Sequence, residues 1–379
     1  MKGDSESTLN LVETNYPGLS DLIIQIRMYL TEKLYHELTG SLITLMSDKN
    51  VSCDDKIQVF ETVVHPLKDS LNTLKFCTLL RLSSESLDPR VALEHLCKYD
   101  KFMEKETEAF VMLQIAKSYH YVKSNQMKEC DTLLDSVKEI VTNTMGLDIS
   151  VHSSYYHASA FMNKACKNYS QCYKDSIMYL AYTSLNDISD TEKTNIAITL
   201  TISAIIAPDC FGFGELIHQP IIETQLKGDH QWLHELLHIF NEGHLQLFDD
   251  ALERHKGKIV HTELNGHESQ LKYKLTLIAL LNLAFRKPNK QRCVTFQEIV
   301  EHCNIQLNEV EPFILKALAC KLIKGSIDHI QEVLRVTWVQ PRILDSNKLE
   351  FVRQRLKGWI TSTNELVSGL EQLSSNAAG

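Results

Sequence analysis

The sequence predicts a mostly helical protein with one small β element near its C-terminus, and three observations lead to this expectation. Glycine and proline are scarce, with 14 and 8 residues among 379. Between Gly40 and Gly146 there is no glycine, so the chain lacks the turns that a β-sandwich or barrel needs every ~8–12 residues. Along most of the chain, apolar residues recur at spacings of three and four, as they do on one face of a helix.

Composition excludes several classes of protein. A net charge of −9 argues against a general nucleic-acid binder, which needs lysine and arginine to neutralise phosphates, so we expect no specific nucleic-acid partner. The N-terminus has no apolar run of the secretory type, and the uncharged stretch 194–208 is shorter than the ~20 residues that cross a bilayer. We therefore expect no membrane partner and a location in the cytoplasm and nucleus.

The 10 cysteines are scattered and include no C-x-x-C pair. This pattern favours reduced thiols over disulfides or zinc ligands. Because Cys77, Cys97 and Cys320 lie within apolar helical patterns, we expect them to be core residues.

The N-terminal half has the pattern of stacked helical hairpins. Apolar stripes of helical period run through segments such as 107–122 and 127–141, and short polar joints separate them. A helix pair that cannot bury its apolar face alone must stack on a neighbour, so the pattern predicts an α-solenoid, which we assign to residues 1–171.

The pattern changes in the last third of the chain, where a long helical stretch at 269–285 precedes two shorter ones. Thr295 and Glu298 form a T-x-x-E capping box, and Asn308 with Glu311 gives a second start signal for a helix that reaches Leu322. Residues 334–338 alternate apolar and polar, as a half-buried strand does. This order of elements predicts a winged helix over residues 269–341, after a helical part at 172–268.

The strand at 334–338 has two interpretations. It packs within its own domain, or it offers an edge to a neighbour's sheet, in which case its partner-binding residues are Leu334, Val336 and Trp338.

The final segment, 345–375, is predicted to be a helix with the most regular apolar seam in the chain. Spacings of three and four alternate along it, and Thr363 is its one polar position. An isolated surface helix would not leave such a seam in water, so we predict that it binds partner chains. The alternative is that the helix folds back onto the winged helix. Its predicted partner-binding residues are Leu349, Val352, Leu356, Trp359, Leu366, Leu370 and Leu373.

One catalytic motif has to be weighed. His234, Glu235 and His238 form H-E-x-x-H, which in zinc peptidases supplies two metal ligands and a general base. His244 has the spacing of a third ligand, but Asn241 replaces the glycine that turns the chain toward it, and no methionine follows for a methionine turn. The histidines fall opposite the apolar face of the helix, so we interpret them as solvated. We predict no catalytic residue, metal or cofactor; a zinc peptidase remains a remote alternative.

Helical repeats that run into a winged helix, together with several short strings, resemble the PCI module shared by the proteasome lid, the COP9 signalosome and a translation-initiation scaffold. The resemblance is closest to the members in the proteasome lid. The strings that carry it are Phe213-Gly214-Glu215-Leu216 with Pro220, Thr295-Phe296-Gln297-Glu298-Ile299, Lys324-Gly325-Ser326-Ile327-Asp328, and Thr337-Trp338-Val339-Gln340-Pro341-Arg342 with Leu344-Asp345.

The resemblance implies that residues 172–341 form a PCI domain and that the chain is a scaffold without a catalytic site. It implies other lid subunits as partners, through neighbouring PCI domains and through a C-terminal helix bundle that also holds the deubiquitinase pair. A scaffold of another PCI complex, of the COP9 signalosome or translation-initiation type, is the alternative.

Overall fold

The computed structural model of the protein describes residues 2–48, 50–85, 87–287, 293–340, 353–354, 356–364 and 366–368. The chain divides into two compact units, Met1–Ser189 and Asp190–Gly379. The expected boundary after residue 171 falls inside a helix of the first unit, because that helix packs on the one before it as a hairpin. None of the described helices is long and apolar enough to cross a membrane.

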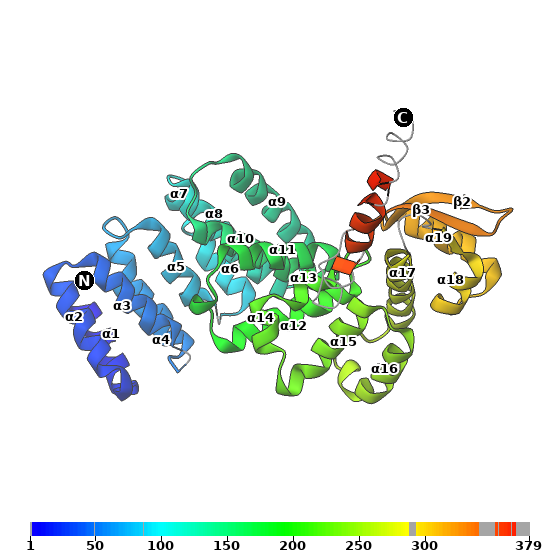
Figure 1. Cartoon of the computed structure of the whole chain (residues 1–379). Coiled ribbons are helices and arrows are strands. Elements are labelled where there is room, and N and C mark those ends of the chain that lie inside the picture. Colours follow the sequence, from blue (N-terminus) through cyan, green and yellow to red (C-terminus); the bar gives the residue numbers. More distant parts are fainter. Residues whose placement is uncertain are drawn as a thin grey trace, which may run out of the picture. The chain divides into compact units, whose positions relative to one another are not determined.

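The first unit is built from helices that pack on their neighbours in sequence, as the solenoid prediction requires (Figure 1). Adjacent helices lie side by side, with α2 on α3, α8 on α9, and α10 on α8 and α11. The helices are α1 (Lys2–Asn15), α2 (Ser20–Glu32), α3 (Tyr35–Ser47), α4 (Cys53–Val59), α5 (Thr73–Ser84), α6 (Pro89–Cys97), α7 (Asp100–Met103), α8 (Thr107–Lys123), α9 (Met127–Asn143), α10 (Ile149–Ala165) and α11 (Tyr169–Tyr182).

One hairpin shows how local sequence sets these elements. The predicted helices at 107–122 and 127–141 are confirmed as α8 and α9, and between them Asn125 takes a left-handed conformation with φ 61°. Asparagine tolerates this region better than most residues, so the polar joint ends one helix and allows the next to turn back. Cys130, Leu134 and Val137 are buried along one stripe of α9.

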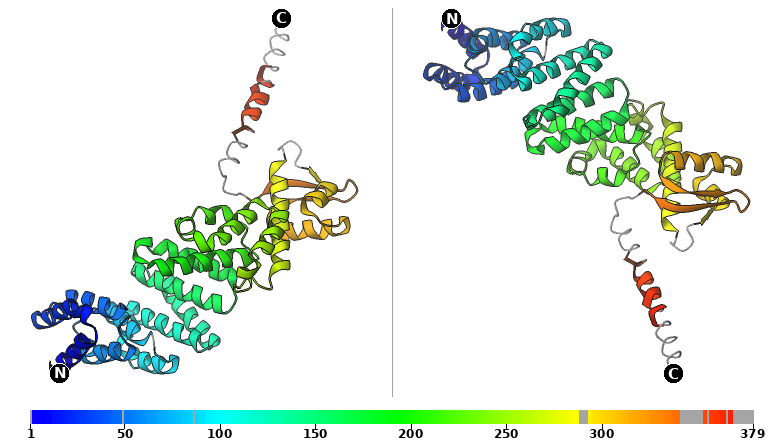
Figure 2. Two further views of the ribbon diagram at one scale, coloured as in Figure 1. Left: turned by 90° about the horizontal axis from the view of Figure 1, so that it is seen from below. Right: turned by 90° about the horizontal axis from the view of Figure 1, so that it is seen from above.

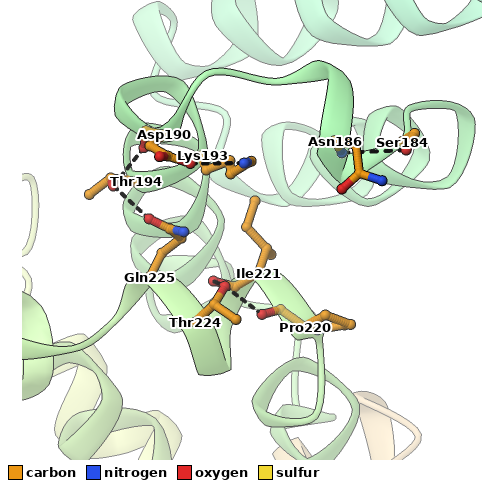
Figure 3. A network of polar contacts seen from close by, with 9 residues as sticks. All are labelled: Ser184, Asn186, Asp190, Lys193, Thr194, Pro220, Ile221, Thr224 and Gln225. Atoms are coloured by element: carbon orange, nitrogen blue, oxygen red, sulfur yellow. Dashed lines mark hydrogen bonds and ion pairs between the residues drawn. The ribbon is translucent and has the colours of Figure 1, made fainter.

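The second unit continues with helices and contains a small sheet (Figure 2). Within it, Thr194 of α12 donates a hydrogen bond to Gln225 at the end of α14, with 2.9 Å between Oγ1 and Oε1 (Figure 3). The elements are α12 (Asp190–Ile206), α13 (Phe213–Ile217), α14 (Pro220–Gln225), α15 (Gln231–Glu242), α16 (Leu245–Ile259), α17 (Glu268–Arg286), β1 (Cys293–Thr295), α18 (Phe296–Cys303), α19 (Val310–Ala319), β2 (Ile323–Asp328) and β3 (Val333–Val339).

Helix α17 organises this unit through a buried lysine. Lys274 is 5% exposed, and its Nζ donates to the backbone oxygens of Ala204, Ile205 and Ala207 at 2.7, 3.0 and 2.6 Å. Ala204 and Ile205 belong to the last turn of α12, and Ala207 directly follows its last residue. At this end helix carbonyls lack partners and the helix dipole is negative. Burial lowers the pKa of Lys274 to about 8, so the side chain remains largely charged at pH 7.

A second polar residue of α17 forms a hydrogen bond with the C-terminal end of another helix. Asn282 donates from Nδ2 to the oxygen of Glu242 at 2.8 Å, at the C-terminus of α15. The next residue, Gly243, has φ 73°, and a Cβ there would lie 2.9 Å from the Asn282 Nδ2. The glycine therefore provides both the left-handed turn and the room for α17.

The winged helix is confirmed, and of its three strands the sequence analysis placed only β3 by its residues. The three-stranded antiparallel sheet has the order β1-β3-β2, and β3 lies between the other two. The predicted capping box starts α18, with Glu298 N bonded to Thr295 Oγ1 and Thr295 N to Glu298 Oε2. Strand β1 is only three residues long, so its alternation was too short to detect.

Two local expectations were wrong. The second short helix ends at Ala319 rather than Leu322, because Lys321 takes a left-handed φ of 57° and the chain turns into β2. Cys97 is exposed and Cys320 is half-buried, whereas Cys77 is buried as expected. Cys97 is the last residue of α6.

We predict that Lys274→Met lowers the free energy of unfolding by about 2–4 kcal/mol, because it leaves buried carbonyls of α12 without a donor. Lys272→Met on the same helix removes only the exposed ion pair with Asp249 and should cost about 0.5 kcal/mol or less. Urea denaturation followed by circular dichroism compares the two. Equal effects would contradict the role assigned to Lys274.

We also predict a pH dependence from His120, which is 3% exposed and whose Nδ1 has no hydrogen-bond partner in the described part of the chain. Burial, followed by the charge of Lys123, lowers its pKa from 6.5 to about 4. Below pH 6.5 the unfolded chain binds a proton there that the folded chain does not, so stability falls as the pH drops toward 4. The loss is about 3 kcal/mol.

The measurement is the urea midpoint between pH 7 and pH 4. His120→Leu should flatten this dependence, and His36→Leu, at an exposed position of α3, should leave it unchanged. An identical pH dependence in wild type and His120→Leu would show that His120 is not the titrating group.

Candidate partner-binding surfaces

The C-terminal segment is helical in its described residues, 353–354, 356–364 and 366–368. Three predicted seam residues, Leu356, Trp359 and Leu366, are 51%, 69% and 67% exposed. Within the described part of the chain, nothing covers these side chains, which is unusual for large apolar groups on consecutive turns. The other predicted seam residues, Leu349, Val352, Leu370 and Leu373, lie outside the described residues.

The polar seam position is satisfied within the helix. Thr363 donates from Oγ1 to the backbone oxygen of Trp359 at 2.9 Å, so a partner chain need not supply a hydrogen-bond group there.

The seam is wider than the sequence analysis predicted. Ile360 and Val367 are also exposed, at 57% and 48%. They lie seven residues apart and one position beyond Trp359 and Leu366, so they form a second row beside the seam. Their seven-residue spacing was the signal that could have found them. Two adjacent rows present a broad apolar face, which suits a bundle of several helices better than a single pair.

The three predicted partner-binding residues of the sheet differ from one another in exposure. Leu334 is fully buried and Val336 is nearly so, while Trp338 is partly exposed with the Lys324 Nζ 5.1 Å from the centre of its ring. The interpretation of 334–338 as an edge strand is wrong for Leu334, which pairs with β1 on one side and β2 on the other. Strand β1 reaches only Val333–Arg335, so among the described residues 336–339 pair with β2 alone. A central strand packs one full face on the helices beneath it, so the side chains on that face are buried.

The outer strand on the hairpin side is β2, and it contains a register shift between Lys324 and Gly325. A Cβ on Gly325 would lie 2.2 Å from the backbone oxygen of Arg335. Only glycine allows this close approach, so the bulge depends on it. The edge that could receive another strand is therefore bent at Gly325.

The H-E-x-x-H segment lies on α15 with the arrangement expected from its helical pattern. Trp232, Leu233, Leu236, Leu237 and Phe240 are buried. His238 is exposed and His234 is half-buried, with their ring centres 4.6 Å apart. Burial, followed by the charge of His238, lowers the pKa of His234.

Glu235 is held by the next helix rather than placed beside a metal position. Its Oε1 lies 2.8 Å from the guanidinium of Arg254, and its Oε2 lies 3.0 Å from His255 Nε2. These contacts, with the hydrogen bond from His255 as the largest cause, lower the pKa of Glu235. Among the described residues, no group of three or more histidine, cysteine, aspartate or glutamate side chains could hold a metal ion. Glu235 therefore joins α15 to α16.

Comparison with known proteins decides the family. A family profile described as PSD13 N-terminal repeats matches residues 22–237, and one described as PCI domain matches residues 246–338. The chain belongs to the PSD13 family. The resemblance to the PCI proteins of the proteasome lid is thereby confirmed, and the PCI match covers the sheet and the helices around it.

Relatives of the PSD13 family match over nearly their full length. The 26S proteasome non-ATPase regulatory subunit 13 of Dictyostelium discoideum is 30% identical over 90% of this chain and 90% of its own length. The probable 26S proteasome regulatory subunit rpn9 of Schizosaccharomyces pombe is 31% identical over 97% of this chain and 98% of its own. By contrast, eukaryotic translation initiation factor 3 subunit M of Drosophila erecta is 26% identical over only 47% of this chain.

We predict that the chain retains no stoichiometric zinc after dialysis against a chelator, although His234 and His238 can capture nickel or zinc weakly. Glu235→Gln should change the free energy of unfolding by about 1 kcal/mol or less, because solvent screens its partly exposed ion pairs. Elemental analysis and a peptidase assay check the prediction. Stoichiometric zinc together with a peptidase activity that Glu235→Gln abolishes would contradict it.

Proposed function

We propose that this chain is a scaffold subunit of the regulatory particle of the 26S proteasome, where it supports ubiquitin-dependent protein degradation without a catalytic site of its own. The observation that carries the proposal is the match to proteasome regulatory subunits over 90–97% of the chain. In this proposal the chain acts in the cytoplasm and nucleus.

The C-terminal helix is the proposed attachment point to the assembly. Its exposed rows, Leu356 and Trp359 with Ile360, supply apolar area that water would otherwise cover. In the proposed arrangement, the helix enters a bundle formed by other lid subunits, including the deubiquitinase pair. Burial of these side chains gives affinity, and the alternate spacing of three and four residues gives register.

The sheet is the proposed second contact, through the PCI domain of a neighbouring subunit. The edge of β2 supports this role, since an unpaired backbone edge can accept a strand from another chain. Trp338 replaces Leu334 and Val336 as the side chain of β3 that can contribute, because it is the exposed member of the three. We propose a functional division into repeats at 1–171, a PCI domain at 172–341 and a bundle helix at 345–375.

A scaffold of the translation-initiation type is the second candidate, and the partial match to subunit M favours it over other PCI assemblies. The two candidates differ in the partner proteins that they predict, although the binding surfaces of the chain are the same in both. Mass spectrometry of complexes purified in gentle salt separates them, because one candidate brings proteasome subunits and the other brings initiation factors.

We predict that truncation after Ser346 leaves the melting temperature within a few degrees of wild type but prevents the chain from joining the assembled particle. Leu356→Glu combined with Leu366→Glu should do the same, since two carboxylates in an apolar bundle cannot be desolvated without large cost. The measurement is co-purification of the chain with the particle, together with thermal unfolding of the isolated chain.

A matched control is Leu11→Glu combined with Leu247→Glu, two leucines of similar exposure outside the seam. This control should assemble normally. A truncated chain that melts much lower would show that the helix completes its own core. A truncated chain that assembles at full occupancy would show that the seam is not the partner contact.

A further inference from the structure

The exposed seam of the C-terminal helix has a shape that a second helix can cover. Leu356, Trp359 and Leu366 follow one another on turns of the same helix, and more than half of each side chain is exposed. Apolar residues that alternate at spacings of three and four fit between the side chains of a facing helix with the same spacing. A second copy of this chain supplies such a helix.

Side-chain size decides in which direction two copies of the helix fit. The seam contains one very large residue, Trp359, and one turn later a small one, Thr363. Two parallel helices in register would place indole against indole at one level and would leave a gap between two threonines at the next. Antiparallel helices centred on Thr361 place Trp359 of each copy opposite Thr363 of the other, so each large side chain faces a small one.

The same antiparallel register also pairs the leucines of the seam. Leu356 and Leu366 lie at equal distances on either side of Thr361, so Leu356 of one copy faces Leu366 of the other. The Thr363 hydroxyl already donates to the backbone oxygen of Trp359 in its own helix, so an indole placed against it leaves no hydrogen bond unmade. The seam is therefore complementary to itself, as the contact between two identical subunits about a two-fold axis must be.

The distribution of charge along the segment favours the same direction. In the sequence, residues 345–357 contain four basic and two acidic residues, which is a net charge of +2. Residues 358–375 contain two acidic residues and no basic one, which is a net charge of −2. A parallel pair would bring like charges together, whereas an antiparallel pair places the basic half of each copy beside the acidic half of the other. Such charges select the direction, and the apolar seam provides the affinity.

We propose that two copies of this chain pair through their C-terminal helices, antiparallel and centred on Thr361. The pair covers Leu356, Trp359 and Leu366 and leaves the second row, Ile360 and Val367, at its margin. It is therefore weaker than a bundle that covers both rows, and it gives way to the bundle of the proposed assembly. The pairing is a property of the free chain and does not depend on the proposed function.

The first experiment is sedimentation velocity of the full chain between about 1 and 100 µM. We expect the mass to rise from that of one chain toward that of two across this range, because a short apolar seam gives micromolar affinity. Truncation after Ser346, and Leu356→Glu combined with Leu366→Glu, should each leave a single chain. The matched control, Leu11→Glu combined with Leu247→Glu, should pair as wild type does. A wild type that stays a single chain at 100 µM, or a truncated chain that still pairs, would overturn the proposal.

The second experiment determines the direction of the pair. The photoreactive residue p-benzoylphenylalanine replaces Leu356 in one batch of the full chain, which is mixed with wild-type chain labelled with ¹⁵N so that links between copies are recognised by mass. We expect the link to reach the residues around Leu366 of the other copy. Ser368, on the opposite side of the helix from the seam, is the control position and should give few links. Links from position 356 to the region of Leu356 in the other copy, or equal yields from positions 356 and 368, would contradict the antiparallel pair.

A third experiment exchanges the charges. Arg353→Glu combined with Lys357→Glu makes both halves of the segment acidic, and Glu365→Lys combined with Glu371→Lys makes both halves basic. Each variant alone should pair about tenfold more weakly than wild type, and an equal mixture of the two should pair at least as tightly as wild type. Unchanged pairing of the single variants, or a mixture no tighter than either variant, would show that charge does not guide the contact.

Discussion

The buried ammonium of Lys274 is the interaction on which the second unit depends. It supplies three donors to the C-terminal carbonyls of α12 from a position on α17, and the rings of Phe211 and Phe213 lie 5.6 and 5.0 Å from it. A lone buried charge would be costly, but here the helix end provides the compensating dipole and the rings provide a polarizable wall. Because α17 also begins the winged helix, this contact sets where the sheet stands relative to the helices before it.

Many nucleic-acid readers share the winged-helix fold, and the described side chains of this one agree with our expectation of no specific nucleic-acid partner. The exposed side chains of α19 include Leu315 and Pro312, which cannot read base edges, and Glu311 is engaged with His329 of the β2–β3 turn. Lys287, one of the basic residues before the sheet, is paired with Glu298 of the capping box. The domain instead exposes a strand edge and apolar side chains, which suit contact with another protein.

The PSD13 family match and the exposed seam of the C-terminal helix concern different parts of the chain. The family match extends over the repeats and the PCI domain, and the seam lies beyond both matched ranges. An apolar face two rows wide has no use in an isolated chain and invites aggregation. In the proposed assembly this face is buried, and each of its side chains then contributes hydrophobic free energy.

The sequence by itself determined the helices, the face that α15 buries, and the capping box of Thr295 and Glu298. These features depend on periodicity and on hydrogen bonds between residues close in the chain, so local pattern contains them. Only the tertiary structure decided that β3 is central, that Lys274 reaches carbonyls about seventy residues away, and that Glu235 pairs with α16. Each of these depends on which distant segments meet, and the free energy of such contacts is not encoded in any short stretch of sequence.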